Sequence, residues 1–258
     1  MSVKAAVLHA PGTNRDREAA WACELAGATP EIVPLGALVA RERRLDDYGL
    51  VILPGGFSYG DDLGAGKVAA LILRTRLGDD LDAFIASGRP VIGICNGFQI
   101  LVKAGFLPGT RSDGRPTATL SHNARGRFEC RWVTLEPVAG TTCAFLDDLA
   151  EPILCPVAHG EGRVTFTSDL AGRDAARRGL VALRYAPTPD TDDGYPGNPN
   201  GSAGHVAALT NPAGNVLGLM PHPEDHLVPT QHPRFHRGER HGSGLTLFTR
   251  AVAYAARR

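Results

Sequence analysis

The chain lacks the features that mark several large classes of protein. Its 27 basic and 27 acidic side chains cancel to a formal net charge of zero, so charge gives no reason to expect binding to nucleic acid or to an anionic membrane. Its five cysteines are widely spaced, without a Cys-x-x-Cys pair. That usage fits a reducing cytosol better than a secreted disulfide scaffold.

Long hydrophobic runs are missing as well. The run from Val68 to Leu73 is far too short to cross a bilayer, and residues 1–10 lack the apolar core of a signal peptide. Because hydrophobic residues still make up 43% of the chain, the 31 glycines and 19 prolines indicate tight turns rather than disorder. We therefore expect a soluble, cytoplasmic protein.

The first half of the chain alternates short apolar runs with stretches of helical periodicity. Strands are predicted at residues 4–9, 31–33, 50–53 and 91–94. Helices are predicted at residues 15–26, 68–76 and 80–86, and from residue 95 to about 105. This βαβ alternation predicts an α/β fold with a mostly parallel central sheet and helices on both faces.

The pattern changes after about residue 120. Short strands are predicted at residues 131–136, 153–157, 164–167, 180–185, 205–210 and 215–220. The last two flank the turn sequence Asn-Pro-Ala-Gly at 211–214, which indicates a hairpin. A polar loop at 190–204 and a closing helix at 244–256 complete the chain. Without a long linker, we expect one domain, residues 1–258, in which this half adds a smaller mixed or antiparallel sheet region.

Cys95 lies at the corner between a predicted strand and a predicted helix. The unpaired N–H groups and the dipole of a helix N-terminus favour a thiolate. Gly93 and Gly97 on either side permit the close backbone approach that a nucleophile elbow needs. Taken alone, a buried structural cysteine is the commoner interpretation, and we interpret the other four cysteines in that way.

A glycine loop, residues 54–62, follows the strand at 50–53 directly. Ligands bind at the carboxyl edge of open α/β sheets, so the N–H groups of this loop are candidates for an oxyanion hole beside Cys95. A plain glycine turn is the alternative. A phosphate-binding P-loop is disfavoured because no Gly-Lys-Ser/Thr ends the loop.

His222 and Glu224 offer a base and an orienting carboxylate, which cysteine catalysis requires. They are two positions apart, and the prolines at 221 and 223 are expected to keep them extended on one face. A proline-rich turn is an alternative. A zinc site formed by the histidines at 222, 226, 232, 236 and 241 is disfavoured, because they lack helical or finger spacing.

Five stretches together resemble the class I glutamine amidotransferases, and within them the glutaminase subunits of phosphoribosylformylglycinamidine synthase. They are residues 55–61 (GGFSYGD), 93–99 (GICNGFQ), 158–163 (AHGEGR), 198–202 (NPNGS) and 218–224 (GLMPHPE). The resemblance covers most of the chain and implies a flavodoxin-like class I glutamine amidotransferase fold.

The resemblance also implies the roles of the site residues in glutamine hydrolysis. Cys95 would form a thioester, His222 would move protons and Glu224 would orient it. The N–H of Asn96 and one near Gly56 or Phe57 would stabilise the oxyanion. Gln99 would help to hold the substrate.

The resemblance implies partners too. Ammonia would pass to a synthetase subunit that makes formylglycinamidine ribonucleotide from formylglycinamide ribonucleotide, and a small third subunit would bridge the two. ATP and Mg²⁺ would belong to that partner, with no cofactor in this chain.

The sequence departs from the family pattern at two places. Arg15 stands where the first loop commonly has cysteine, and Asp225 stands where arginine often follows the Pro-His-Pro-Glu stretch. The histidine-rich segment 225–242 has no assigned role. A different cysteine hydrolase that acts alone, or a non-catalytic regulator of a partner, are the other functions considered; the Cys, His and Glu set argues against the regulator.

Overall fold

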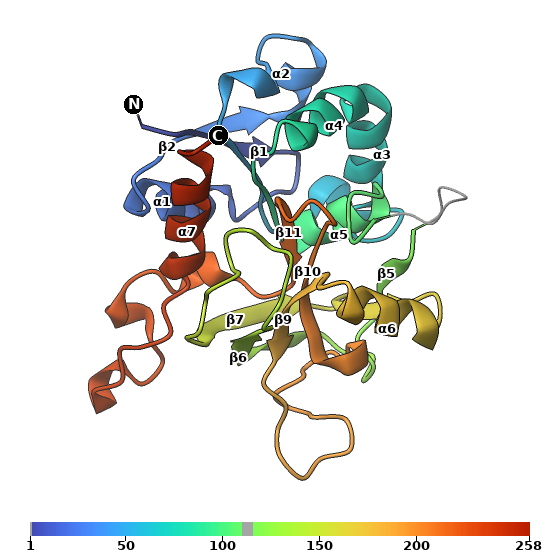
Figure 1. Ribbon diagram of the computed structural model, residues 1–258, viewed down its shortest axis with the longest axis vertical. Coiled ribbons are helices and arrows are strands. Elements are labelled where there is room, and N and C mark those ends of the chain that lie inside the picture. The colour runs from blue at the N-terminus through green and yellow to red at the C-terminus, as the bar shows by residue number, and fades with distance from the viewer. Residues whose placement is uncertain (1, 110–115) are drawn as a thin grey trace.

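In the computed structural model, which describes residues 2–109 and 116–258, a nine-stranded sheet runs through the molecule (Figure 1). Its strand order is β2-β1-β3-β4-β11-β10-β9-β6-β7. The strands are β1 (Lys4–His9), β2 (Thr29–Pro34), β3 (Leu50–Leu53), β4 (Val91–Ile94), β6 (Glu129–Pro137), β7 (Ile153–His159), β9 (Val181–Tyr185), β10 (Val206–Thr210) and β11 (Val216–Leu219). A separate two-stranded sheet pairs β5 (Ala118–Ser121) with β8 (Arg163–Phe166).

Helices cover both faces of the parallel half, as the βαβ pattern predicts. They are α1 (Asp16–Leu25), α2 (Leu35–Val39), α3 (Lys67–Arg76), α4 (Gly78–Ala86), α5 (Asn96–Lys103) and α7 (Leu245–Ala255). Helix α6 (Asp169–Arg177) instead contacts β8 of the small sheet. Helices α1 and α7 pack together on one side of β3, while α3 and α5 pack together on the other (Figure 1). Asp16 and Glu18 lie in the first turn of α1, where the helix dipole favours acidic side chains.

The central strands of the sheet are fully buried. Every residue of β3, β4 and β11 is buried, as expected for strands covered on both faces. Strand β11 pairs parallel with β4 and antiparallel with β10, so it joins the two halves. The hairpin predicted around 211–214 is confirmed. The antiparallel strands extend the main sheet, and β5 and β8 form the separate small sheet.

The far end of the sheet curls back over the carboxyl edge of β4. Pro156 in β7 accepts a hydrogen bond of 2.8 Å from the backbone N–H of His222. The carbonyl of Ala158, two residues on, lies 3.8 Å from the sulfur of Cys95. Residues more than sixty positions apart thereby enclose one site.

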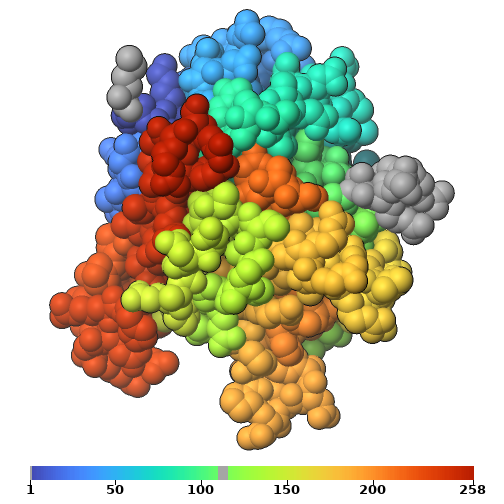
Figure 2. All heavy atoms as spheres, in the orientation of Figure 1, coloured from blue at the N-terminus to red at the C-terminus, as the bar shows by residue number. Residues whose placement is uncertain are grey.

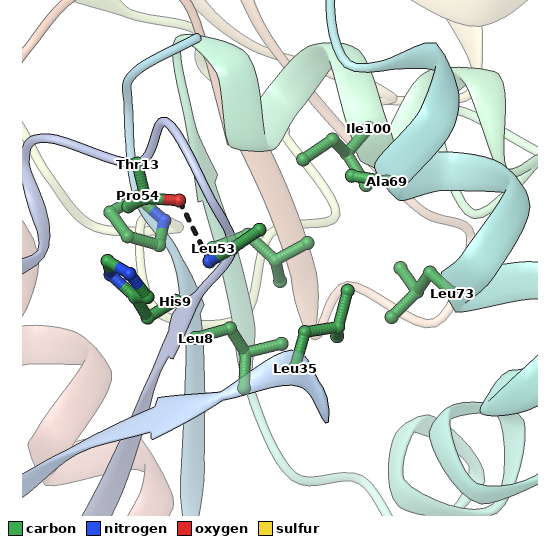
Figure 3. Close-up of a pocket in the computed structure, with 10 residues that line it drawn as sticks. Leu8, His9, Thr13, Leu35, Leu53, Pro54, Ala69, Leu73 and Ile100 are labelled. Atoms are coloured by element: carbon green, nitrogen blue, oxygen red, sulfur yellow. Dashed lines mark hydrogen bonds between the residues drawn. The ribbon is translucent and has the colours of Figure 1, made fainter. Parts of the chain in front are cut away.

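The first loop, residues 10–15, is fastened over the sheet beside Pro54 (Figure 3). Its Thr13 hydroxyl accepts the backbone N–H of Ala10 at 3.1 Å. Beneath it lies a mostly apolar cavity of about 20 Å³ lined by Leu8, Leu53 and Ile100, among others. That volume holds about one water molecule, so the cavity is a packing gap and not a substrate site.

Two regions project from the body, one within the loop between β9 and β10 and one within the stretch that precedes α7 (Figure 2). Over the described ranges, 2–109 and 116–258, no helix combines the length and apolarity needed to span a bilayer.

Candidate active site

Cys95 sits at the predicted strand–helix corner in a conformation that few residues adopt. Its φ of 50° and ψ of −105° fall in the left-handed half of the map, at a cost of about 1–3 kcal/mol that is typical of functional sites. A Cβ on Gly97 would lie 1.9 Å from the carbonyl oxygen of Leu53, so only glycine lets α5 approach β3 this closely. The predicted elbow is confirmed.

The Cys95 side chain is 6% exposed and its thiol donates to the carbonyl oxygen of Ala158 at 3.8 Å. Its backbone N–H donates to Leu219 at 2.8 Å. Of the other four cysteines, Cys130 is exposed, whereas Cys23, Cys143 and Cys155 are buried. Burial raises the pKa of the Cys23 and Cys143 thiols to about 12, which keeps them protonated and unreactive.

His222 and Glu224 form a buried pair. Nδ1 of His222 lies 2.7 Å from Oε1 of Glu224, and the two residues are 3% and 0% exposed. The carboxylate can only accept, so Nδ1 carries the proton and Nε2 presents a lone pair. Among the described residues, Nε2 has no hydrogen-bond partner, which leaves it free to take a proton from a thiol.

The predicted extended backbone between these two residues is wrong. The residues from Pro223 to Asp225 form one turn of 3-10 helix, and His222 is its N-cap. The proline at the first helical position fits this turn because it needs no N–H there. The turn, rather than strand alternation, brings the Glu224 carboxylate back to the imidazole.

The electrostatic setting favours a protonated His222 during the reaction. Burial lowers the pKa of His222, but the charges of Glu224 and Cys95 and the hydrogen bond to Glu224 outweigh it and raise the pKa well above its usual value. The protonated form of His222 is therefore favoured beside the Glu224 carboxylate.

Two backbone N–H groups, of Asn96 and Gly56, have no acceptor in the described part of the chain. Asn96 is the first residue of α5, so its N–H has no intrahelical acceptor. In the glycine loop, Phe57 donates its N–H to Gly12 at 2.9 Å, which occupies one of the two predicted loop donors. The Gly56 N–H has no acceptor among the described residues, so it is the loop donor that the geometry favours.

Asn96 and Gln99 are buried in a hydrogen-bond network behind the nucleophile. Asn96 Nδ2 donates to Gln99 Oε1 at 3.0 Å and to Asp61 Oδ1 at 3.1 Å. Gln99 Nε2 donates to the carbonyl of Glu161 at 2.5 Å. The Gln99 side chain thus connects α5 to the loop 160–162. The sequence did not single out the Asp61 carboxylate, whose pKa burial raises.

Residues of the stretches 158–163 and 198–202 lie close together and are linked by hydrogen bonds. Asn200 Nδ2 donates to the Gly162 carbonyl at 2.8 Å, and Nδ1 of buried His159 lies 3.2 Å from Asn123 Oδ1. Burial and the charge of His222 lower the pKa of His159 to about 3, so it stays neutral. Asn123 carries no motif and could not have been found from sequence.

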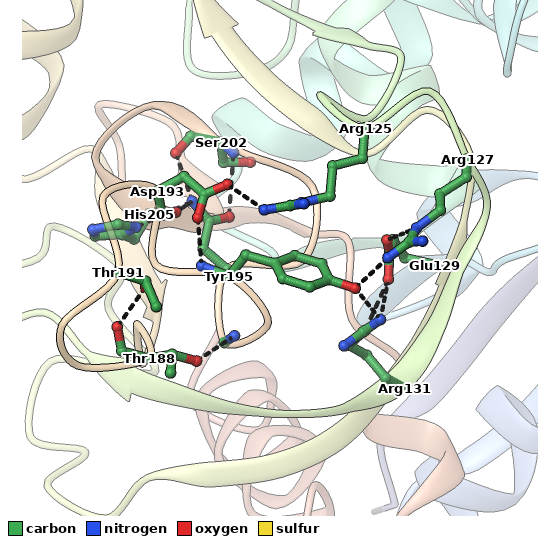
Figure 4. Close-up of polar contacts among 12 residues, drawn as sticks. Arg125, Arg127, Glu129, Arg131, Thr188, Thr191, Asp193, Tyr195, Ser202 and His205 are labelled. Carbon is green, nitrogen blue, oxygen red and sulfur yellow. Dashed lines mark hydrogen bonds and ion pairs between the residues drawn. The ribbon is translucent and has the colours of Figure 1, made fainter.

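Tyr195 fastens the polar loop between β9 and β10 to strand β6 (Figure 4). Its hydroxyl accepts from Arg127 at 2.5 Å and from Arg131 at 2.6 Å. Both arginines also pair with Glu129, which is 1% exposed. The guanidinium carbon of Arg125 lies 3.9 Å from the tyrosine ring centroid. This cluster is satisfied internally and serves to order the loop.

The histidine-rich segment gathers His232, Glu239 and His241, whose donor atoms lie within 4.8 Å of one another. Nδ1 of His232 accepts the Arg234 backbone N–H at 3.0 Å, so in the neutral ring the proton lies on Nε2, 4.0 Å from Glu239 Oε2. A metal ligand needs that lone pair. This pattern does not favour a metal, and we assign none.

Known proteins resemble the whole chain. A family model described as CobB/CobQ-like glutamine amidotransferase domain matches residues 2–255. A protein of Treponema denticola named phosphoribosylformylglycinamidine synthase subunit PurQ is 45% identical, over 98% of this chain and 99% of that one. A PurQ subunit of Dehalococcoides mccartyi is 41% identical, over 98% of each.

Solved structures agree. A chain in the structure of PurLQS from Thermotoga maritima is 34% identical, covers 98% of this chain and 99% of its own length, and superposes with a TM-score of 0.74. A glutaminase domain of Trypanosoma brucei CTPS with bound acivicin is 16% identical, over 100% of this chain and 95% of its own, with a TM-score of 0.55. That second likeness concerns the fold alone.

Proposed function

Because the chain belongs to the CobB/CobQ-like glutamine amidotransferase family, and within it to the PurQ subunits of phosphoribosylformylglycinamidine synthase, we propose that it hydrolyses glutamine for purine biosynthesis. The products are glutamate and ammonia, and the ammonia serves a partner synthetase. The whole chain, residues 1–258, acts as one glutaminase domain.

Attack on the substrate begins at Cys95. The thiolate sulfur bonds to the side-chain amide carbon of glutamine, and the carbonyl electron pair moves to the oxygen. The N–H groups of Gly56 and Asn96 donate to this oxyanion, which is the largest stabilising effect available in such a site. Imidazolium His222 then protonates the departing nitrogen, the C–N bond breaks, and ammonia leaves a thioester on Cys95.

Hydrolysis of the thioester by water completes the catalytic cycle. Neutral His222 takes a proton from water as its oxygen attacks the thioester carbonyl. The carbon–sulfur bond breaks, glutamate is released and the thiolate–imidazolium pair returns. Glu224 keeps the imidazole in one tautomer and orientation throughout, while Gln99 shapes the pocket that holds the substrate.

The complex supplies what this chain does not. We assign ATP and Mg²⁺ to the synthetase, which converts formylglycinamide ribonucleotide to formylglycinamidine ribonucleotide, and we expect a small subunit to bridge the two proteins. The similar chain in the structure of PurLQS from Thermotoga maritima supports assembly with a PurL subunit. We place the complex in the cytoplasm.

The observation that carries this proposal is the unpartnered, buried Nε2 of His222, aligned by Glu224 at 2.7 Å in the same enclosed site as Cys95. The test is glutamate release by the reconstituted complex with Cys95→Ala. We expect a loss of several orders of magnitude; undiminished release would disprove the assignment.

A further inference from the structure

An ion pair crosses from the first loop to the turn that carries Glu224. Nη1 of Arg15 lies 3.6 Å from Oδ1 of Asp225. The side chains are 37% and 20% exposed, so the pair is partly shielded from water. Arg15 is the N-cap of α1, and Asp225 closes the 3-10 turn that His222 begins.

The backbone of Arg15 reaches the oxyanion loop. Its N–H and that of Asn14 both point at the carbonyl oxygen of Gly55, each at 3.3 Å. In a trans peptide the C=O of one residue and the N–H of the next point in opposite directions. With the Gly55 carbonyl held toward the first loop, the Gly56 N–H is directed away from it, where no protein acceptor among the described residues meets it.

Gly55 also lies against the catalytic base. A Cβ built on Gly55 would stand 2.7 Å from Cε1 of His222 and 3.4 Å from Cγ of Arg15. One residue, Arg15, therefore contacts the peptide next to the oxyanion donor through its backbone and the Glu224 turn through its guanidinium. A shift of Arg15 would disturb both halves of the site.

The ionised carboxylate of Asp225 does not stabilise the fold. Burial and the neighbouring charge of Glu224 raise the pKa of Asp225 to about 6, although His222 and Arg15 oppose them. Folding thus favours the neutral form, and an ionised Asp225 weakens the fold at neutral pH. Local costs of this kind concentrate at functional sites.

We propose that Arg15 and Asp225 are a positioning pair that fixes the Gly55–Gly56 peptide and the His222–Glu224 turn relative to each other. The inference rests on the proposed function. It assigns the pair no contact with substrate; the two side chains act through Gly56 and Glu224. Losing the pair loosens the transition-state geometry more than substrate binding.

Replacing Asp225 changes the charge around the site, because Asp225 has ionisable neighbours on three elements. These are Glu224 and His222 around the 3-10 turn, Arg15 and Glu18 around the start of α1, and Cys155 in β7. Asp225→Asn removes one negative charge near His222. The imidazolium then loses its proton at a lower pH, so the pH profile of Cys95 alkylation by iodoacetamide moves to lower pH.

The experiment measures glutamate release by the reconstituted complex with Arg15→Gln, Asp225→Asn and the double variant. We expect each single change to lower kcat by about 10 to 100-fold with KM within about twofold. Because the two side chains act together, the double variant should be no slower than the worse single variant. Asp82→Asn, which breaks the exposed 3.0 Å pair with Arg74, is the matched control and should keep wild-type kcat.

Three results would overturn the inference: wild-type kcat in either single variant, additive losses in the double variant, or an unshifted alkylation profile in Asp225→Asn. A structural role alone would lower the melting temperature of Asp225→Asn at pH 7, whereas we expect it unchanged or raised. Wild-type complex and Cys95→Ala are run beside these variants. If Cys95→Ala releases glutamate, the proposed function fails; if only the pair variants behave as wild type, this inference alone fails.

Discussion

Asn96 and Gln99 are joined by a hydrogen bond of 3.0 Å in which the Asn96 amide donates to the Gln99 carbonyl oxygen. Gln99 in turn donates to Glu161 at 2.5 Å. The residue after the nucleophile is therefore connected, through one buried side chain, to a loop more than sixty positions away. The position of the loop 160–162 relative to α5 depends on that connection.

Gln99→Met should weaken both the attachment of the loop 160–162 to α5 and the stability of the fold. Methionine has a similar volume but leaves the Glu161 carbonyl and the Asn96 amide without their partner, at about 1–3 kcal/mol per buried group. We expect a lower melting temperature and a KM for glutamine raised by about tenfold, measured by calorimetry and steady-state kinetics. Unchanged values for both would show that the loop 160–162 is held by other contacts.

Glu224→Gln should leave the fold intact and remove most of the activity. The glutamine amide can present its NH₂ to Nδ1, which moves the imidazole proton to Nε2 and eliminates the base. We expect kcat to fall by about 100 to 10,000-fold, measured as glutamate release by the complex. Glu136→Gln, at an exposed position in β6, is the control. A kcat within a factor of two of wild type would refute the role of Glu224.

His159 should limit stability in acid. Its pKa is lowered to about 3 by burial and by the charge of His222, so below its ordinary value the unfolded chain binds a proton that the folded chain refuses. The resulting loss begins near pH 6.5 and continues as the pH falls toward 3. The sign is therefore destabilising toward acid.

The test compares denaturant unfolding of wild type and His159→Asn at pH 7 and pH 4.5. From 6.5 to 4.5 is 2 pH units, so wild type should lose about 2–3 kcal/mol more than the variant between the two conditions. The comparison of slopes is unaffected by any constant loss that the variant suffers. Equal losses in the two proteins would mean that His159 does not titrate as described.

Local patterns predicted the parallel half of the fold and the corner at Cys95. The runs at 50–53 and 91–94 are wholly apolar, and both became fully buried central strands. The local sequence patterns do not predict helices α2 and α6 or strand β5, because these elements are short or strongly polar. Helix α6, for example, buries only Ala175, so it lacks an apolar face to mark it.

The assembly of the site could not be predicted from local patterns. Nothing near Pro156 or Ala158 indicates that β7 folds back over β4, since that contact depends on the curl of the whole sheet. The sequence does not distinguish the 3-10 turn at Pro223 from extended chain, because proline fits both conformations. Motifs therefore identified His222 and Glu224, but the Arg15–Asp225 contact required the three-dimensional structure.

The most direct test of the account is to locate the cysteine that a glutamine-analogue electrophile modifies. Treating the complex with 6-diazo-5-oxo-norleucine, followed by peptide mass mapping, should give one adduct, on Cys95, whose formation glutamine prevents. Exposed Cys130 is the internal control and should remain unmodified. An adduct on Cys130 with Cys95 intact, or labelling of Cys95 that glutamine does not slow, would contradict the account.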